Sequence, residues 1–137
     1  MRDRYLHWET IPTRWRDNDL YGHINNVVHY EYFDTVINRY LITSGGLDIK
    51  AGEVIGVAAS SSCEYRAPLA FPSPVEAGLI VTRLGTSSVH YEIGLFNSGD
   101  DDPAAVGTFV HVFVDRTTRR PVSMPAPVRR ALELITA

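Results

Sequence analysis

The sequence predicts an α+β domain in which a curled antiparallel sheet wraps around one long helix. A single strong helical pattern near the start is followed almost entirely by strand patterns. Three of these strand patterns are successive, alternate with a period of two, and are joined by short polar turns, which is typical of an antiparallel meander. The chain has 137 residues and is 45% hydrophobic, so we expect one domain, residues 1–137, with one ordinary core.

The first two elements are a short strand and the long helix. Residues 5–14 have the pattern of a strand, and Asn25 is a suitable N-cap for the helix that follows. Residues 45–46 are glycines and end the helix. Apolar residues recur at helical spacing and are Val27, Tyr30, Phe33, Val36, Ile37, Tyr40 and Leu41. Because they cover more than half of the circumference, we expect a largely buried helix.

Four strands are expected after the helix, at residues 54–66, 75–84, 89–95 and 105–114. Ser60–Ser62 predict a narrow section of the first of these, packed against the helix. In the last one, four valines share a face with Thr108. A proline-rich connector, residues 121–127, precedes a short amphipathic helix ending near Ile135. Such a sheet leaves edge strands and one face uncovered, which favours association of copies.

Composition excludes several classes of protein. The net charge of -3 gives no general attraction to nucleic acid or anionic membranes. No apolar stretch approaches the roughly 20 residues of a membrane span, and the charged start does not resemble a signal peptide. We therefore expect a soluble cytoplasmic protein. Cys63 is the single cysteine and the histidines lack metal-ligand spacing, so we expect no disulfide, no metal site and no cofactor.

The loop before the long helix holds the residues best suited to chemistry. Residues 13–27 read TRWRDNDLYGHINNV and place two carboxylates, an imidazole and a helix start together. Acyl transfer needs a base or nucleophile beside donors for a developing oxyanion. We expect Asp19 to stay ionised near the helix start, and the free N–H groups of Asn25, Asn26 and Val27 to polarise a carbonyl. Alternatively, Asp19 only caps the turn.

Residues 14–33, which read RWRDNDLYGHINNVVHYEYF, resemble the hotdog-fold acyl-CoA thioesterases of the 4-hydroxybenzoyl-CoA thioesterase-like family. The family pattern D-x-D-x-x-G-H-V-N-N stands here at residues 17–26, with Ile24 at the valine position. Residues 113–125 also look like the closing strand and tail of the family, so the likeness covers nearly the whole chain. The resemblance implies a hotdog fold, hydrolysis of an acyl-CoA and a homodimer or homotetramer with the active site at the dimer interface.

By the same resemblance, Asp19 is the catalytic carboxylate, acting as nucleophile or as general base, and Asn26 belongs to the catalytic groups. Tyr21, Gly22, Asn25 and Val27 are expected to line the substrate. Gly22 either adopts a backbone conformation closed to other residues or permits close approach of the substrate.

His23 has two interpretations. Plant acyl-ACP thioesterases share the H-x-N-N element and have been given a catalytic histidine there, with an Asn two positions earlier. Tyr21 stands at that position here, so we favour a buried His23 that supports the loop over a role in proton transfer.

Two other aspartates have secondary interpretations. Asp17 is expected to be structural and to pair with Arg14 or Arg16. Asp34 stands where family members carry a glutamate followed by an arginine three residues later, and that arginine is absent here. Asp34 is a reserve catalytic acid, although we favour the interpretation that it is a polar position on the less buried side of the helix.

Coenzyme A carries phosphates, and guanidinium groups bind phosphate bidentately. Arg116, Arg119 and Arg120 cluster after the last strand, and Arg66 ends an earlier one. We expect Arg66, Arg119 and Arg120 to bind the nucleotide end; the alternative for the cluster is a solvated turn.

Two other functions on this fold remain open. A hydratase or dehydratase acting on acyl thioesters typically carries a D-x-N-P-x-H element, which is absent. A non-catalytic acyl-CoA binding protein usually needs an attached effector domain. The acyl chain itself is not specified by the sequence.

Overall fold

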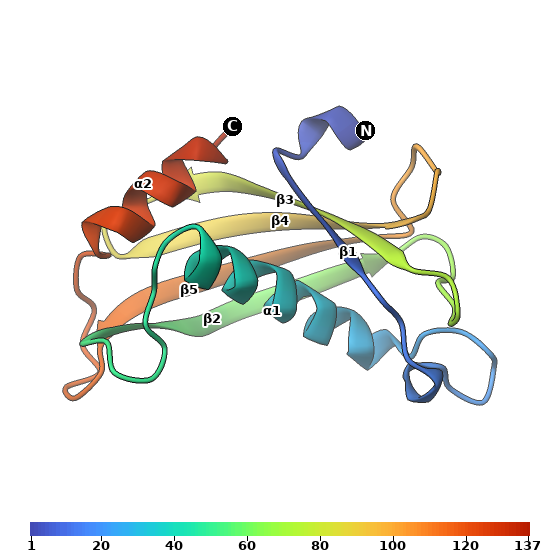
Figure 1. Cartoon of the computed structure of the whole chain (residues 1–137), viewed down its shortest axis with the longest axis horizontal. Helices are drawn as coiled ribbons and strands as arrows, with labels where there is room; N and C mark the ends of the chain where they lie inside the picture. Colours follow the sequence, from blue (N-terminus) through green and yellow to red (C-terminus); the bar gives the residue numbers. More distant parts are fainter.

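The computed structural model describes residues 1–137 and has the α+β architecture that the sequence predicts. A five-stranded antiparallel sheet lies against the long helix α1 (Asn26–Thr43), as Figure 1 shows. The strands are β1 (His7–Ile11), β2 (Val54–Tyr65), β3 (Val75–Leu84), β4 (Ser88–Asn97) and β5 (Ala105–Asp115). Helix α2 (Ala126–Leu134) ends the chain, and 3₁₀ turns cover Arg2–Arg4 and Trp15–Asp17.

The strand order in the sheet is β1-β3-β4-β5-β2, so β3, β4 and β5 form the predicted meander. Strand β2 returns beside β5 after the helix and has no neighbour on its other side. In this ladder Tyr65 lies opposite Ala105 at one end, and Val54 lies opposite Asp115 at the other. These two ends of the sheet carry different groups of predicted site residues.

Helix α1 begins at the predicted cap, because the Asn25 side chain accepts a hydrogen bond from the Val27 N–H at 2.9 Å. From Phe33 to Leu41 its buried face follows the expected spacing and packs on the sheet. Nearer the start, His29 and Tyr32 are buried in place of Val27 and Tyr30. Phe33 lies against Gly107 of β5, where an added Cβ would come within 2.4 Å of the ring. A glycine at this point lets the helix approach the sheet closely.

Only one face of α1 is buried, so the expectation of a largely buried helix is wrong for the single chain. The side chains of Val27, Glu31, Asp34, Thr35 and Arg39 are exposed. The reason is that the sheet covers the helix from one side and nothing within the chain covers the other.

Of the four valines of β5, only Val114 is buried. Phe109, His111 and Phe113 point to the side of α1 and are buried, whereas Val110 and Val112 are only half-buried. A period of two establishes that a strand has two faces but leaves open which one meets the helix.

The strand expected at residues 5–14 is confined to His7–Ile11. Tyr5 lies outside it and packs over Gly78 and Gly94, with its hydroxyl donating to Glu92 at 2.8 Å. Aromatic packing on two glycines therefore replaces strand pairing at this point.

Ser60–Ser62 do not pack against the helix as expected. They are exposed in β2, directly after an irregularity in the pairing between Ala58 and Ser60. Small side chains here leave the free edge of the sheet accessible. None of the helices has the length and apolar character needed to cross a membrane.

Candidate active site

The loop between β1 and α1 is anchored by Asp17, whose side chain is 1% exposed. Its carboxylate accepts hydrogen bonds from the Arg14 backbone N–H at 2.9 Å, from Arg14 Nε at 3.0 Å and from the Tyr32 hydroxyl at 2.7 Å. Burial acts to raise the pKa of Asp17, but the bonds from Tyr32 and Arg14 outweigh it and the pKa is lowered. The predicted structural role and the pairing with Arg14 are confirmed.

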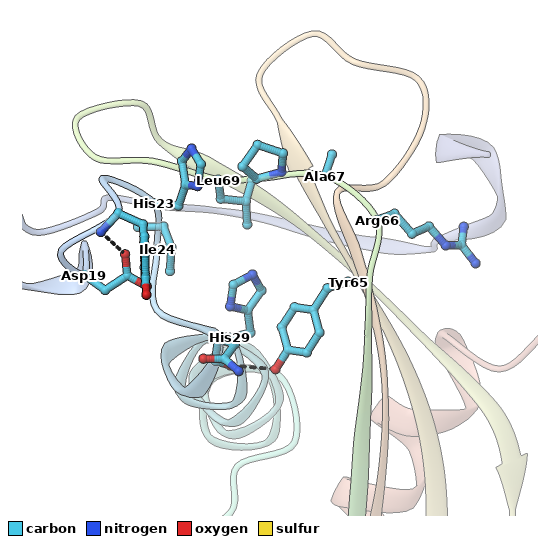
Figure 2. A pocket seen from close by; sticks show the side chains of 11 residues that line it. Asp19, His23, Ile24, His29, Tyr65, Arg66, Ala67 and Leu69 are labelled. Carbon is cyan, nitrogen blue, oxygen red and sulfur yellow. Dashed lines mark hydrogen bonds between the residues drawn. The ribbon is translucent and has the colours of Figure 1, made fainter.

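A hollow of about 410 Å³ lies between this loop, the first turn of α1 and the segment after β2. Figure 2 shows the three segments facing one another across it. Of the predicted site residues, the hollow brings together Asp19, Tyr21, His23, Asn26 and Arg66.

Asp19 closes a turn and also faces the hollow. One carboxylate oxygen accepts a hydrogen bond from the Tyr21 N–H at 2.8 Å (Figure 2), and the Asp19 N–H donates to the His23 carbonyl at 2.9 Å. The second carboxylate oxygen has no hydrogen-bond partner within the chain. Asp19 therefore caps the turn, and its second carboxylate oxygen remains available to a substrate.

Only one of the three helix-start amides is free, which corrects the expectation for the other two. The Asn25 N–H donates to the Asp17 carbonyl at 2.9 Å, and the Val27 N–H donates to the Asn25 side chain at 2.9 Å. The Asn26 N–H makes no hydrogen bond within the chain, and Asn26 lines the hollow. It is the donor that this helix start offers to a carbonyl oxygen.

Gly22 has a φ of 82°, so the predicted backbone conformation closed to other residues is confirmed. An added Cβ there would meet nothing within 4 Å, so it is the backbone angle that requires glycine within one chain. The neighbouring Leu20 and Tyr21 are 104% and 87% exposed.

His23 is exposed and its imidazole makes no hydrogen bond within the chain. The favoured interpretation, a buried ring that holds the loop, is therefore wrong. Backbone bonds hold this turn, because the His23 carbonyl accepts from Asp19.

Two residues of the hollow were not selected from the sequence, His29 and Tyr65. His29 lies in the first turn of α1, is 3% exposed, and packs edge-on against Tyr65 with ring centroids 4.9 Å apart. Tyr65, from the end of β2, donates its hydroxyl to the Asn26 carbonyl at 2.7 Å. Burial lowers the pKa of His29, opposed by its hydrogen bond to Asn25. The position of His29, four residues after the cap, was the available signal, since this spacing places both on one helix face.

The predicted phosphate-binding arginines lie at opposite ends of the sheet. Arg66 borders the hollow but pairs with Glu64 at 3.2 Å, and the adjoining groove is lined by Asp100, Asp101 and Asp102. Arg119 and Arg120 are exposed in the turn after β5, at the other end of the sheet (Figure 1).

Two further expectations concern residues outside the hollow. Arg116, counted with the arginine cluster, donates to the Gly52 and Ile49 carbonyls at 2.6 and 2.7 Å and so fixes the loop after α1. Asp34 is exposed, accepts from Asn38 at 3.0 Å and does not line the hollow. No three His, Cys, Asp or Glu side chains come together as a metal site would require.

A sequence model described as the thioesterase-like superfamily matches residues 13–132. The chain belongs to this superfamily. It is therefore a thioester hydrolase, and its sheet and central helix are those of a hotdog fold. No curated protein sequence matches it significantly.

Solved structures agree with this assignment. The PA5185 protein of Pseudomonas aeruginosa PAO1 is 56% identical, with 99% of this chain and 95% of that chain covered and a TM-score of 0.98. The PA2801 protein of the same species is 31% identical, with 93% and 98% covered and a TM-score of 0.86. Slr0204, a 1,4-dihydroxy-2-naphthoyl-CoA thioesterase from Synechocystis, is 16% identical, with 91% and 93% covered and a TM-score of 0.82. At that identity the likeness to Slr0204 shows the fold alone.

Proposed function

We propose that this thioesterase hydrolyses an acyl-CoA or aroyl-CoA to the free acid and CoA in the hollow beside Asp19. One observation carries the proposal. A carboxylate oxygen of Asp19 and the N–H of Asn26, both without partners in the chain, border the same hollow at a helix start. The resemblance of residues 17–26 to the motif of the acyl-CoA thioesterases supports a CoA ester as the class of substrate.

In the proposed reaction, the Asn26 N–H and the positive end of α1 stabilise the negative charge that develops on the carbonyl oxygen. Asp19 either attacks the acyl carbon or activates a water molecule, and both routes stay open. Tyr21, Gly22 and His23 border the approach to this carboxylate.

We also propose that the active unit is a homodimer built on the free edge of β2. This edge strand has 12 residues and is largely exposed, and a long unpaired edge favours pairing with another chain. A twofold axis makes such pairing antiparallel, so the end of one β2 at Tyr65 meets the start of the other at Val54.

Val54 lies opposite Asp115, directly before the turn that carries Arg119 and Arg120. Antiparallel pairing of two β2 edges therefore brings this turn of one subunit toward the hollow of the other. The arginines expected at the nucleotide would then come from the second subunit, although they are remote within one chain. Whether dimers pair further into tetramers, and the expected cytoplasmic location, stay predictions.

The test is thiol release from a panel of straight-chain, branched and aromatic CoA esters, together with the mass of the protein in solution. We expect turnover of at least one ester and a dimer or tetramer. Hydration of crotonyl-CoA without thiol release would favour the hydratase, and saturable binding without turnover would favour an acyl-CoA binding protein. Either result would contradict the proposal.

A further inference from the structure

We propose that His29 is a further catalytic residue, whose Nε2 accepts the proton of the water molecule that hydrolyses the acyl group. This inference rests on the proposed thioesterase function and adds a proton acceptor to it. Four features of the structure support it: the tautomer, the access, the fixed position of the ring and the charges around it.

The tautomer follows from the partner of Nδ1. His29 Nδ1 lies 3.2 Å from the carbonyl oxygen of Asn25. A carbonyl oxygen only accepts hydrogen bonds, so Nδ1 must carry a proton. Because burial lowers the pKa of His29, the ring is neutral near pH 7 and Nε2 has a free lone pair.

Access to the hollow follows from the absence of another partner. Every fully buried side-chain nitrogen or oxygen in the structure has a hydrogen-bond partner, whereas Nε2 of His29 has none within the chain. Nε2 is therefore not fully buried. Nε2 is therefore reachable from the hollow that His29 lines. Figure 2 shows the ring directed into this space, between Tyr65 on one side and Ile24 and Asp19 on the other.

The ring is held in place on two sides. Its Nδ1 is hydrogen-bonded to the Asn25 carbonyl, and the ring packs in a T-shaped arrangement against Tyr65. The Tyr65 hydroxyl in turn donates to the Asn26 carbonyl. The free Asn26 N–H belongs to the same turn of backbone. The proton acceptor and the oxyanion donor are thus positioned by one short rigid segment, as catalysis requires.

The charged and titratable groups around the hollow come from two other segments. Asp19, Tyr21 and His23 face it from the loop, and Tyr65 and Arg66 face it from the end of β2. An ionised Asp19 on the same hollow favours the imidazolium that forms when Nε2 takes the proton. The Asp19 carboxylate therefore assists proton transfer to His29 even in a route where it does not attack the acyl carbon.

The step balances with water as the only added reactant. The water oxygen bonds to the acyl carbon while its proton moves to Nε2, and the C=O electron pair moves onto the oxygen that faces the Asn26 N–H. When the carbonyl re-forms, the C–S bond breaks and the CoA sulfur takes the proton from Nε2. If Asp19 has already taken the acyl group, the same water attack expels the Asp19 carboxylate, and Nε2 loses its proton to solvent.

Two substitutions separate proton transfer from structural support. His29→Asn keeps a donor near Nδ1 for the Asn25 carbonyl and lacks the far nitrogen. His29→Gln places an amide near Nε2 that can accept a hydrogen bond but not a proton. His90→Gln is the matched control, because His90 lies half-buried on β4 and does not line the hollow. Thermal unfolding of each variant checks that it is folded.

We expect both His29 variants to lose kcat by about 100-fold with little change in KM, while His90→Gln stays within about twofold of wild type. The wild-type kcat should fall in acid below pH 6.5, as Nε2 becomes protonated, and the His29 variants should lack this step. Wild-type kcat in a folded His29→Asn, or rescue by His29→Gln, would overturn the role of a proton acceptor.

A nitrogen-15 NMR spectrum of the imidazole rings tests the same inference without turnover. We expect His29 to be neutral with the proton on Nδ1, and a proton on Nε2 at neutral pH would overturn the inference. Absence of thiol release by the wild type over the whole panel would instead remove the proposed function, and this inference with it.

Discussion

The two halves of the loop before α1 carry the same side chain in opposite settings. In the first half, Asp17 is buried and receives three hydrogen bonds. In the second half, Asp19 keeps a free carboxylate oxygen, and its neighbours Leu20 and Tyr21 are almost fully exposed. Two residues of separation change an aspartate from a structural anchor into a group available for chemistry.

The difference shows how a loop can be rigid and reactive at once. A catalytic group must be held within a fraction of an ångström, and loops are otherwise the more mobile parts of a fold. Here Asp17 ties the loop to Tyr32 and to the Asn25 backbone. The Asp19 carboxylate therefore accepts only the Tyr21 N–H and keeps its second oxygen free.

The largest expected effect is on stability, from Asp17→Ala. Removing a buried, bonded carboxylate leaves Tyr32 and Arg14 without their partner, and we expect a loss of about 4 kcal/mol in the free energy of unfolding. The melting temperature should fall by roughly 10 °C or more. Calorimetry on this variant and on Asp19→Ala checks this prediction. Equal melting temperatures for the two variants would contradict the proposal that Asp17, and not Asp19, anchors the loop.

The second-largest effect is expected in the pH dependence of the free energy of unfolding, because of the buried His111. His111 is 2% exposed between Phe109 and Phe113, with Tyr91 beside it, and burial lowers its pKa to about 4. The unfolded chain binds the proton near pH 6.5 and the folded chain does not, so stability is full above pH 6.5 and is lost toward pH 4. The total change is about 3 kcal/mol.

Urea unfolding at several pH values between pH 7 and pH 4 measures the slope of the free energy of unfolding against pH. His111→Asn removes the titrating group and should flatten most of it, whereas His29 contributes in the same direction. The lowered pKa of Asp17 acts at more acid pH, below its ordinary value of 3.8. An unchanged slope in His111→Asn would show that another group controls acid stability.

The third effect is on activity, from Asp19→Asn. The asparagine keeps an oxygen for the Tyr21 N–H, so the turn should persist and the melting temperature should change little. We expect kcat to fall by about 100-fold or more, because an amide is neither a base nor a nucleophile. Thiol release by wild type and variant decides this, and equal rates would exclude Asp19 as the catalytic carboxylate.

The smallest effect is expected at the other end of the sheet. Replacing Arg119 and Arg120 by glutamine should raise KM for CoA esters by about tenfold with little change in kcat, since each loses a contact to phosphate. Arg66→Gln should have less effect, because Arg66 already pairs with Glu64. Initial rates at varied substrate give both constants, and an unchanged KM would remove this turn from the site.

Much of the fold could be predicted because it depends on residues that are close in sequence. The cap at Asn25, the helix spacing up to Leu41 and the alternation in β3 and β4 are local patterns of backbone geometry. The left-handed backbone at Gly22 belongs to the same class, since it depends on the shape of one turn. The likeness to a thioesterase loop also lies in one uninterrupted segment.

The sequence by itself therefore determined the elements, their antiparallel order along the meander, the loop that carries Asp19 and the class of enzyme. The tertiary structure alone decided which amide is free, because a carbonyl from Asp17 takes the Asn25 N–H. It also decided which face of β5 is buried, and it brought His29 against Tyr65 from a strand 36 residues away. These outcomes depend on contacts between segments distant along the chain, and local spacing carries no information about them.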